Sequence, residues 1–256
     1  MLKTTNRLST LFSAMILSML PPLASADDAA NTDALEEFQV HLVARYIGFS
    51  ADVWTHLSAT ENADEYVYEV TTKARGLAKL VRSGTASEKS IFTLTDIGLR
   101  PISYHLDDGT KKVENDTDIT FDWDAGIARS VYKEEAKDFE LTAGMLDRLT
   151  ADIAAMQKLR SAEEPGSYTL IHRNSIREYG YTSEGKEKIS VDAGEFAAVK
   201  YKYQRPGSTR HTIIWFAPEL GFLPVKAEQF KRGKSQVTME AASIQRGVSG
   251  KSPVSQ

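Results

Sequence analysis

The feature that most constrains the fold is a series of short segments in which apolar and polar residues alternate. In the first of them, Phe38, Val40 and Leu42 fall on one face, and His41 and Arg45 fall on the other. A period of two residues is that of a β-strand with one buried face. Because the segments are short and separated by turn residues, they predict an antiparallel meander that exposes one face to water.

Similar segments recur along the chain and are expected to form strands: 53–57, 65–72, 89–95, 100–106, 117–123, 128–132, 168–173, 176–182, 188–191, 196–204, 210–216, 223–231 and 235–244. Turn-forming residues lie between them, among them Asp108-Gly109, Gly185 and Pro206-Gly207. Charged residues make up 26% of the chain and hydrophobic residues 41%, which is typical of a globular protein with a sizeable core.

One segment, about 142–160, has the period of a helix instead. Its apolar residues recur every three or four positions: Met145, Leu149, Ile153 and Met156. Thr142 is the predicted N-cap, and Pro165-Gly166 is the predicted stop. A helix with one apolar face needs a sheet to pack on, and no linker divides the chain. We therefore predict a mainly β (α+β) fold: one antiparallel, curved, incompletely closed barrel-like sheet with an amphipathic helix packed on it.

The N-terminus has the pattern of a secretory signal peptide. Lys3 and Arg7 precede a mostly apolar stretch at 8–20, and Ala24-Ser25-Ala26 provides small residues for cleavage near Ala26-Asp27. The apolar stretch is shorter than the roughly 20 residues that span a bilayer, which disfavours a membrane anchor. No later run is long enough to cross a membrane. We therefore expect export, to the periplasm if the organism is Gram-negative.

The sequence predicts four parts of the chain. Residues 1–26 are the signal peptide, 27–37 a polar lead-in, 38–246 a single β-rich domain and 247–256 a disordered tail. Nothing in the sequence indicates an oligomeric state.

Composition and motifs exclude several classes of function. The chain has no cysteine, which removes disulfides, thiol nucleophiles, Cys-ligated zinc and iron–sulfur clusters. Its net charge of −4 and pI of about 5.8 argue against nucleic acid as a partner. No G-x-S-x-G, P-loop or G-x-G-x-x-G motif occurs, so no catalytic residue and no cofactor is predicted.

Two groups of residues with metal-binding chemistry are weak candidates for a metal site. The five histidines lie on separate predicted strands, without the spacing of a ligand set: His41, His56, His105, His172 and His211. The acidic stretch at 116–124 offers oxygen ligands suited to calcium, but it lacks the spacing of a calcium-binding loop. Asp118 and Asp122 alternate with Ile119 and Phe121, which indicates the exposed face of a strand. No metal is predicted.

Aromatic residues in the predicted strands are the best candidates for a binding site. In most β proteins they are core residues that pair across strands. In an incompletely closed barrel, the same side chains can line a groove for an acyl chain or a hydrophobic peptide. The predicted groove-lining residues are Trp54, Tyr68, Tyr104, Trp123 and Trp215.

The strand that contains Trp215 becomes apolar on both faces toward its end. This pattern predicts a strand at the centre of the sheet, covered on one side by the helix. Pro218 should end the strand, and Gly221 should allow the turn that follows. We interpret this segment as a corner between two strands that fixes their register. In the alternative interpretation, Trp215 lies at the floor of an apolar groove.

Several stretches, in this order, resemble a bacterial envelope family catalogued as a domain of unknown function (number 3108). They are Lys73–Ala78, Leu99–Tyr104, Phe121–Trp123, Leu146–Thr150, Asp192–Phe196, Trp215–Leu220 and Phe222–Lys226. The resemblance extends from about residue 38 to 245. It implies a signal peptide and an extensively β fold, loosely similar to the open barrels of periplasmic lipoprotein carriers, and it implies no catalytic residues. Fold-level similarity of this kind is a poor guide to function.

Three functions remain open at this stage. The favoured one is a non-catalytic periplasmic binding or carrier module for a lipid, another hydrophobic ligand or an envelope component. The second is an envelope scaffold that has a solid core and binds a protein partner. The least favoured is an envelope hydrolase, which would need two Asp or Glu side chains facing each other in a cleft.

Overall fold

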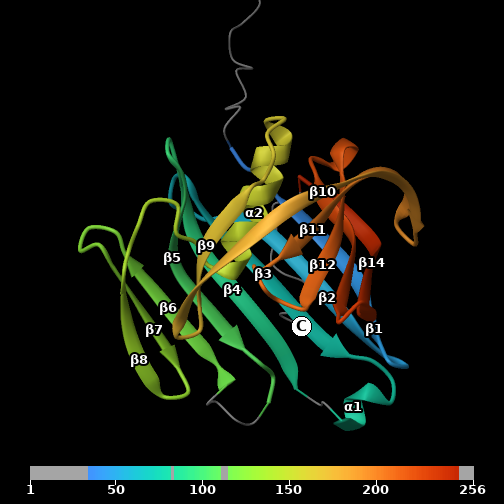
Figure 1. The fold of residues 1–256 in the computed structure, drawn as a ribbon, viewed down its shortest axis with the longest axis horizontal. Coiled ribbons are helices and arrows are strands. Elements are labelled where there is room, and N and C mark those ends of the chain that lie inside the picture. The colour runs from blue at the N-terminus through green and yellow to red at the C-terminus, as the bar shows by residue number, and fades with distance from the viewer. Residues whose placement is uncertain (1–33, 82–83, 111–114, 248–256) are drawn as a thin grey trace, which may run out of the picture. The chain divides into compact units, whose positions relative to one another are not determined.

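The computed structural model describes residues 34–81, 84–110 and 115–247 (Figure 1). Eight strands precede the main helix: β1 (Phe38–Tyr46), β2 (Phe49–Ala59), β3 (Glu65–Ala74), β4 (Thr85–Thr95), β5 (Gly98–Asp107), β6 (Thr117–Asp122), β7 (Ile127–Tyr132) and β8 (Glu135–Glu140). A one-turn helix, α1 (Ala78–Val81), follows β3. The predicted signal peptide at 1–26 lies outside the described residues, as does all but the first residue of the predicted tail.

The second part of the chain begins with the main helix, α2 (Arg148–Arg160). Six strands follow it: β9 (Ser167–His172), β10 (Ser175–Val191), β11 (Gly194–Gln204), β12 (Arg210–Ala217), β13 (Leu223–Lys231) and β14 (Lys234–Arg246). A short 3-10 helix, η2 (Pro218–Leu220), connects β12 to β13.

The 14 strands of the described residues form one antiparallel sheet, in which strands that follow one another in sequence pair, except β8 and β9. The first and last strands also pair, so that Val40 of β1 lies opposite Ile244 of β14. The edges are β8 and β9, the strands on either side of α2. The predicted curved, incompletely closed sheet is confirmed, and Figure 1 shows it curling around α2.

Among the described residues, β8 and β9 do not pair, and side-chain hydrogen bonds connect the two ends of the sheet. The Asn174 amide, in the β9–β10 turn, donates to the backbone oxygens of Tyr132 (3.3 Å) and Glu135 (2.9 Å). The Ser130 hydroxyl of β7 donates to the backbone oxygen of Arg173 at 2.8 Å. The curl therefore closes by contacts between the β9–β10 turn and the β7–β8 region.

The main helix begins later than predicted, so the prediction of Thr142 as N-cap is wrong. The N-cap is Asp147, because Leu146 is held in an extended conformation beside β9. The Leu146 amide donates to the Thr169 oxygen at 3.0 Å, and the Ile171 amide donates to the Leu146 oxygen at 2.9 Å. The helix ends at Arg160 with Ser161 as C-cap, before the predicted stop.

Two strand predictions also need correction. β8 was not predicted, because its sequence is polar and Phe139 is its one buried residue. The segments predicted at 176–182 and 188–191 belong to a single strand, β10. Gly185 does not end the strand, because the pairing of β10 with β11 continues past a β-bulge between Ser183 and Gly185.

The core lies between the concave face of the sheet and α2, and the predicted apolar face of the helix is buried there. Leu149, Ile153 and Met156 are all buried. The main contacts of α2 are with β4, β5 and β9. β12 is an interior strand, but the prediction that the helix covers it directly needs correction. Ile214 of β12 and Met156 of α2 instead both line a cavity.

The features predicted at the end of β12 are confirmed. β12 ends at Ala217, and Pro218 begins the 3-10 helix. Gly221 then adopts φ of +66°, a left-handed conformation that favours glycine. The alternation in β6 is confirmed as well, because Ile119 and Phe121 are buried while Asp118 and Asp122 are exposed.

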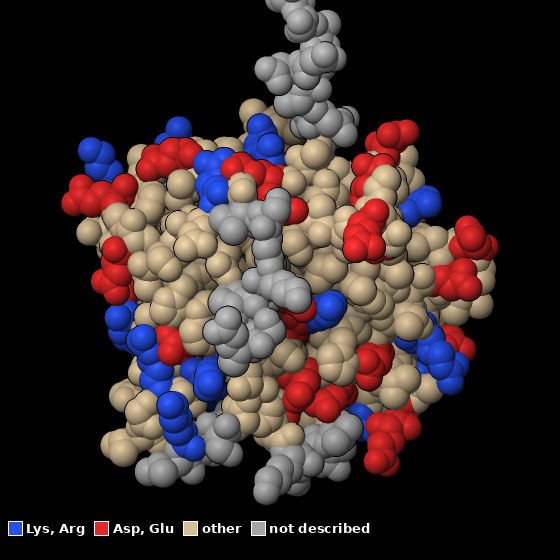
Figure 2. Space-filling model, turned by 180° about the vertical axis from the view of Figure 1, so that it is seen from behind, with Lys and Arg blue, Asp and Glu red and all other residues tan. Residues whose placement is uncertain are grey.

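The outer surface carries charges of both signs. Seen from behind, basic and acidic side chains are interspersed over the molecule (Figure 2). Within the described residues, no helix has the length and apolar character needed to cross a bilayer.

Candidate functional site

The candidate site is a cavity of about 690 Å³ beside α2, on the concave side of the sheet. Its apolar and aromatic lining comes from nine strands and the helix: Leu42, Val53, Tyr68, Val70, Met156, Leu170, Tyr179, Tyr203, Ile214, Phe216, Pro224, Ala227 and Met239. Its charged and ionisable lining is mostly basic: Arg148, Asp152, His172, Arg173, Arg177, Arg205, Arg210, His211 and Lys226. The volume lies in the range of about 300–1,000 Å³ that is typical of ligand pockets.

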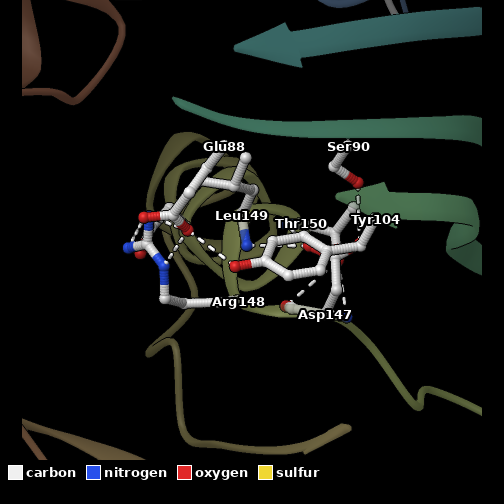
Figure 3. A network of polar contacts seen from close by, with 8 residues as sticks. Glu88, Ser90, Tyr104, Asp147, Arg148, Leu149 and Thr150 are labelled. Atoms are coloured by element: carbon white, nitrogen blue, oxygen red, sulfur yellow. Dashed lines mark hydrogen bonds and ion pairs between the residues drawn. The ribbon is translucent and has the colours of Figure 1, made fainter. Parts of the chain in front are cut away.

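The N-terminus of α2 forms one boundary of the cavity and is fixed by a buried aspartate (Figure 3). The Asp147 carboxylate accepts hydrogen bonds from the amides of Leu149 (2.8 Å) and Thr150 (2.9 Å) and from the Ser90 hydroxyl of β4 (2.7 Å). The Thr150 hydroxyl accepts in turn from the Asp147 amide at 3.0 Å, which completes a capping box. This N-cap therefore both begins the helix and joins it to the sheet.

The next residue of the helix joins the same two elements through an ion pair. The Arg148 guanidinium contacts the Glu88 carboxylate of β4 at 2.6 Å, and the Tyr104 hydroxyl of β5 donates to that carboxylate at 2.8 Å (Figure 3). Burial raises the pKa of Tyr104, and the Glu88 charge raises it further, so the phenol stays protonated as a donor. Arg148 is thereby oriented where it lines the cavity.

Basic residues set the electrostatic character of the cavity. Burial, together with the charges of Arg177, Arg173 and Arg148, lowers the pKa of His172 to about 4. The imidazole is therefore neutral at pH 7, in a region of positive potential. Asp152 is the one carboxylate among the described lining residues, so the cavity does not offer the paired carboxylates of a glycosidase.

Asp152 gives the protein a pH-dependent stability. Its pKa is raised from an ordinary 3.8 to about 6, because burial, with the charges of Glu88 and Asp147, outweighs the opposing charge of Arg148. A carboxyl group with a raised folded-state pKa favours folding when protonated, so its contribution is lost as pH rises from about 4 to about 6.

We expect Asp152→Asn to remove this contribution. The variant should gain stability relative to the wild type as pH rises from about 4 to about 7, as measured by urea unfolding at several pH values. Asp124→Asn, at an exposed position in the β6–β7 turn, is the matched control and should show no such trend. A difference between wild type and Asp152→Asn that is constant with pH would contradict the assignment.

The structure distributes the five predicted groove residues over different environments. Tyr68 lines the cavity, from β3. Trp54 lies on the opposite face of β2 from Val53 and stacks on the His41 ring at 5.1 Å. Neighbouring residues of a strand point to opposite faces, so Val53 lines the cavity and Trp54 does not. Of Tyr68 and Trp54, the structure therefore brings Tyr68 to the cavity.

The other three predicted groove residues make specific contacts outside the cavity lining. Tyr104 is buried against Glu88 as described. The Trp123 indole donates to the Pro101 oxygen at 2.7 Å. The buried Trp215 donates to the Glu187 carboxylate at 3.0 Å, and the Lys226 ammonium lies 5.3 Å from its ring centre. Ligand contact by any of the five residues stays a prediction.

The acidic residues considered for metal binding serve other purposes. Asp118 pairs with His105 at 2.7 Å, and Asp122 accepts from the Ala125 amide at 2.8 Å. Carboxylate oxygens of Asp107, Asp108 and Asp116 lie within 4.8 Å of one another. Asp107 and Asp116 already accept backbone amides of the β5–β6 connection, which accounts for the cluster as a loop-stabilising arrangement.

The residues that sequence analysis missed are the arginines of the cavity: Arg148, Arg173, Arg177, Arg205 and Arg210. Each alone resembles an ordinary surface cation. For Arg205 and Arg210, the available signal was their position on either side of the predicted turn at Pro206-Gly207. The order of strands in the sheet was needed to place these turns at one cavity.

The fold has known structural relatives. A crystal structure of a beta-barrel-like protein of domain of unknown function DUF1849 from Brucella abortus aligns with a TM-score of 0.50 and 7% identity, covering 83% of this chain and 98% of that chain. A chain of the Pseudomonas aeruginosa MucA/MucB complex aligns with a TM-score of 0.39 and 10% identity, covering 86% of this chain and 54% of that chain. Identities this low show similarity of fold alone.

Comparison of sequences gives the family. A search of curated proteins found no significant match. The family model DUF3108, described as a protein of unknown function, matches residues 37–241, from the residue before β1 into β14. The chain therefore belongs to the DUF3108 family, as the motifs in its sequence indicated.

Proposed function

We propose that this protein is an exported, non-catalytic binding or carrier module that holds an acyl-type apolar ligand in the cavity beside α2. The observation that carries the proposal is the cavity itself, whose floor is formed by buried apolar side chains such as Leu42, Met156 and Phe216. Each methylene group moved from water onto such a floor contributes about 0.8 kcal/mol. No catalytic group is needed for this activity.

The position of the cavity supports the proposal. The sheet packs solidly on α2 at β4 and β5, where Phe92 is fully buried. Ile214 and Ala227 of β12 and β13, by contrast, line open space together with Met156 of the helix. A scaffold with a solid core throughout would not need this space. The signal-peptide pattern at 1–26 supports a location outside the cytoplasm.

Filling the cavity is expected to weaken ligand binding. Ala227 lies opposite Ile214 in the β12–β13 ladder, and both line the cavity. Ala227→Trp places an indole in that space and should weaken binding of an uncharged fluorescent probe, N-phenyl-1-naphthylamine, by at least about tenfold. Ala197→Trp, at an exposed position in β11 outside the lining, is the matched control.

The outcomes separate the proposed function from its alternatives. Probe binding that is lost in Ala227→Trp and kept in Ala197→Trp supports a ligand-holding cavity. A wild-type protein that binds neither the probe nor long-chain acyl ligands would refute the carrier proposal. It would then favour the scaffold alternative, especially if one protein co-purified in stoichiometric amount.

A further inference from the structure

The lining of the cavity changes from apolar to basic between its floor and its rim. The buried lining residues are apolar or aromatic: Leu42, Val53, Tyr68, Met156, Leu170 and Phe216. The exposed lining residues are three arginines, Arg173, Arg205 and Arg210. A molecule that fills this cavity therefore meets an apolar surface at one end and guanidinium groups at the other.

The strand register brings these arginines to the same end of the sheet. β11 ends at Gln204, opposite Gly180 of β10, so the β11–β12 turn with Arg205 lies alongside the first residues of β10. Arg177 lies in that part of β10, and Arg173 lies in the turn before it. The stacked rings of Tyr179 and Tyr203, with centres 4.8 Å apart, hold the two strands together there.

Most of these cations have no acidic partner within the described part of the chain. Arg148 is paired with Glu88, and Lys226 is paired with Glu240 at 3.2 Å. Arg173, Arg177, Arg205 and Arg210, which we call the rim arginines, form no ion pair with a described residue. Arg173 lies over the Tyr132 ring at 4.8 Å, and Arg177 donates to the Ser175 hydroxyl at 3.1 Å.

Unpaired guanidinium groups are well suited to bind phosphate. The planar group offers a fork of donors that matches two phosphate oxygens, and the hydrogen bonds are charge-assisted. The net charge of the chain is −4, so general basicity does not account for the rim arginines. On the rear surface in Figure 2, by contrast, charges of both signs are interspersed.

We propose that the ligand of this cavity is a phosphate-headed lipid, with its acyl chain on the apolar floor and its phosphate bound by the rim arginines. This inference rests on the proposed function and adds the chemistry of the headgroup. The apolar floor distinguishes such a lipid from a free phosphate ion, which would gain nothing from Leu42 or Phe216.

The test compares three probes that separate the headgroup from the chain. Oleoyl lysophosphatidic acid has both parts, mono-oleoylglycerol has the chain without the phosphate, and inorganic phosphate has no chain. Affinities are measured on the full chain by calorimetry, below the micelle concentration of each lipid. We expect the lysophosphatidic acid to bind roughly tenfold or more tighter than mono-oleoylglycerol, and the difference to shrink when salt is raised from about 0.05 M to about 0.5 M.

Variants assign the difference to the rim arginines. Changing all four together, as R173Q/R177Q/R205Q/R210Q, should reduce lysophosphatidic acid binding to the level of mono-oleoylglycerol. Unchanged mono-oleoylglycerol binding shows that the fourfold variant is folded. If the fourfold variant does not fold, the double variant R205Q/R210Q replaces it, because it leaves the β9–β10 turn unchanged. The matched control, R45Q/R129Q/R160Q/R232Q, removes the same charge at exposed arginines outside the lining and should bind as the wild type does.

Each contrary outcome has a distinct meaning. Equal binding of the two lipids by the wild type would overturn the headgroup inference and leave the proposed function intact. A wild-type protein that binds neither lipid would overturn the proposed function as well. Inorganic phosphate that binds as tightly as the lipid would assign the rim arginines to the free ion. An equal loss of lipid binding in the control variant would show a general effect of charge, which also overturns the inference.

Discussion

Replacing Asp147 with alanine is expected to destabilise the protein by about 3 kcal/mol, because one side chain both caps α2 and anchors it to the sheet. Loss of an N-cap alone costs about 1 kcal/mol. Asp147, Ser90 and Thr150 each have 0% of their surface exposed. The Ser90 hydroxyl and the Leu149 and Thr150 amides would therefore lose an acceptor where little water can replace it, at about 1–3 kcal/mol for an unsatisfied buried group.

Urea unfolding followed by circular dichroism measures this effect, and two variants interpret it. Asp124→Ala, at an exposed position, should change the free energy of unfolding by less than about 0.5 kcal/mol. Asp147→Asn retains a capping oxygen and should recover part of the loss. A cost below about 1 kcal/mol for Asp147→Ala would mean that the sheet holds α2 without its cap.

Truncating Phe92 to alanine is expected to cost about 3–5 kcal/mol. Phe92 lies in β4, has 0% of its surface exposed and stacks on the Tyr66 ring with centres 5.9 Å apart. β4 is one of the strands that contact α2, so a void here would loosen the solid side of the core. The loss combines the hydrophobic transfer of the ring with the unfilled space that it leaves.

Chemical denaturation of Phe92→Ala and of Ile97→Ala tests this prediction. Ile97 lies in the β4–β5 turn with 75% of its surface exposed, so its truncation should change stability by less than about 0.5 kcal/mol. If the two variants were equally stable, the packing of β4 against the core would be wrong. Because Phe92 does not line the cavity, Phe92→Ala that remains folded should still bind the uncharged probe.

The strands were predictable because one face of each is buried. In β6, burial alternates residue by residue as the sequence indicated, with Ile119 and Phe121 inside. β8 was missed for the complementary reason: it is an edge strand with five exposed positions, so its sequence carries almost no hydrophobic pattern. β10 continues through Gly185 because pairing with β11 tolerates a bulge there.

The start of the main helix shows where local signals compete. Met145 and Leu146 fit the helical spacing and are buried, yet Leu146 pairs with β9 in an extended conformation. Thr142 and Asp147 are both good N-cap residues by type. A contact with Ser90, 57 residues earlier in the chain, favours Asp147. Local sequence contains no information about that contact.

The candidate site was predictable only in outline. Aromatic residues in strands pointed to the concave face, and Tyr68 does line the cavity. Trp54 lies on the opposite face of its strand, where it stacks on His41, and the sequence did not indicate which face of that strand would line the cavity. The rim arginines were not singled out, because their proximity depends on the pairing of β10 with β11.

The sequence by itself determined the period-two strands, the single main helix, the family motifs and the absence of cysteine chemistry. These follow from local stereochemistry and from which residues can be buried, and both act over a few neighbouring positions. Tertiary structure alone decided that the curled sheet leaves a cavity beside α2 and that arginines from two separate turns line it. Both depend on strand order, register and sheet curvature, which arise from contacts between residues far apart in the chain.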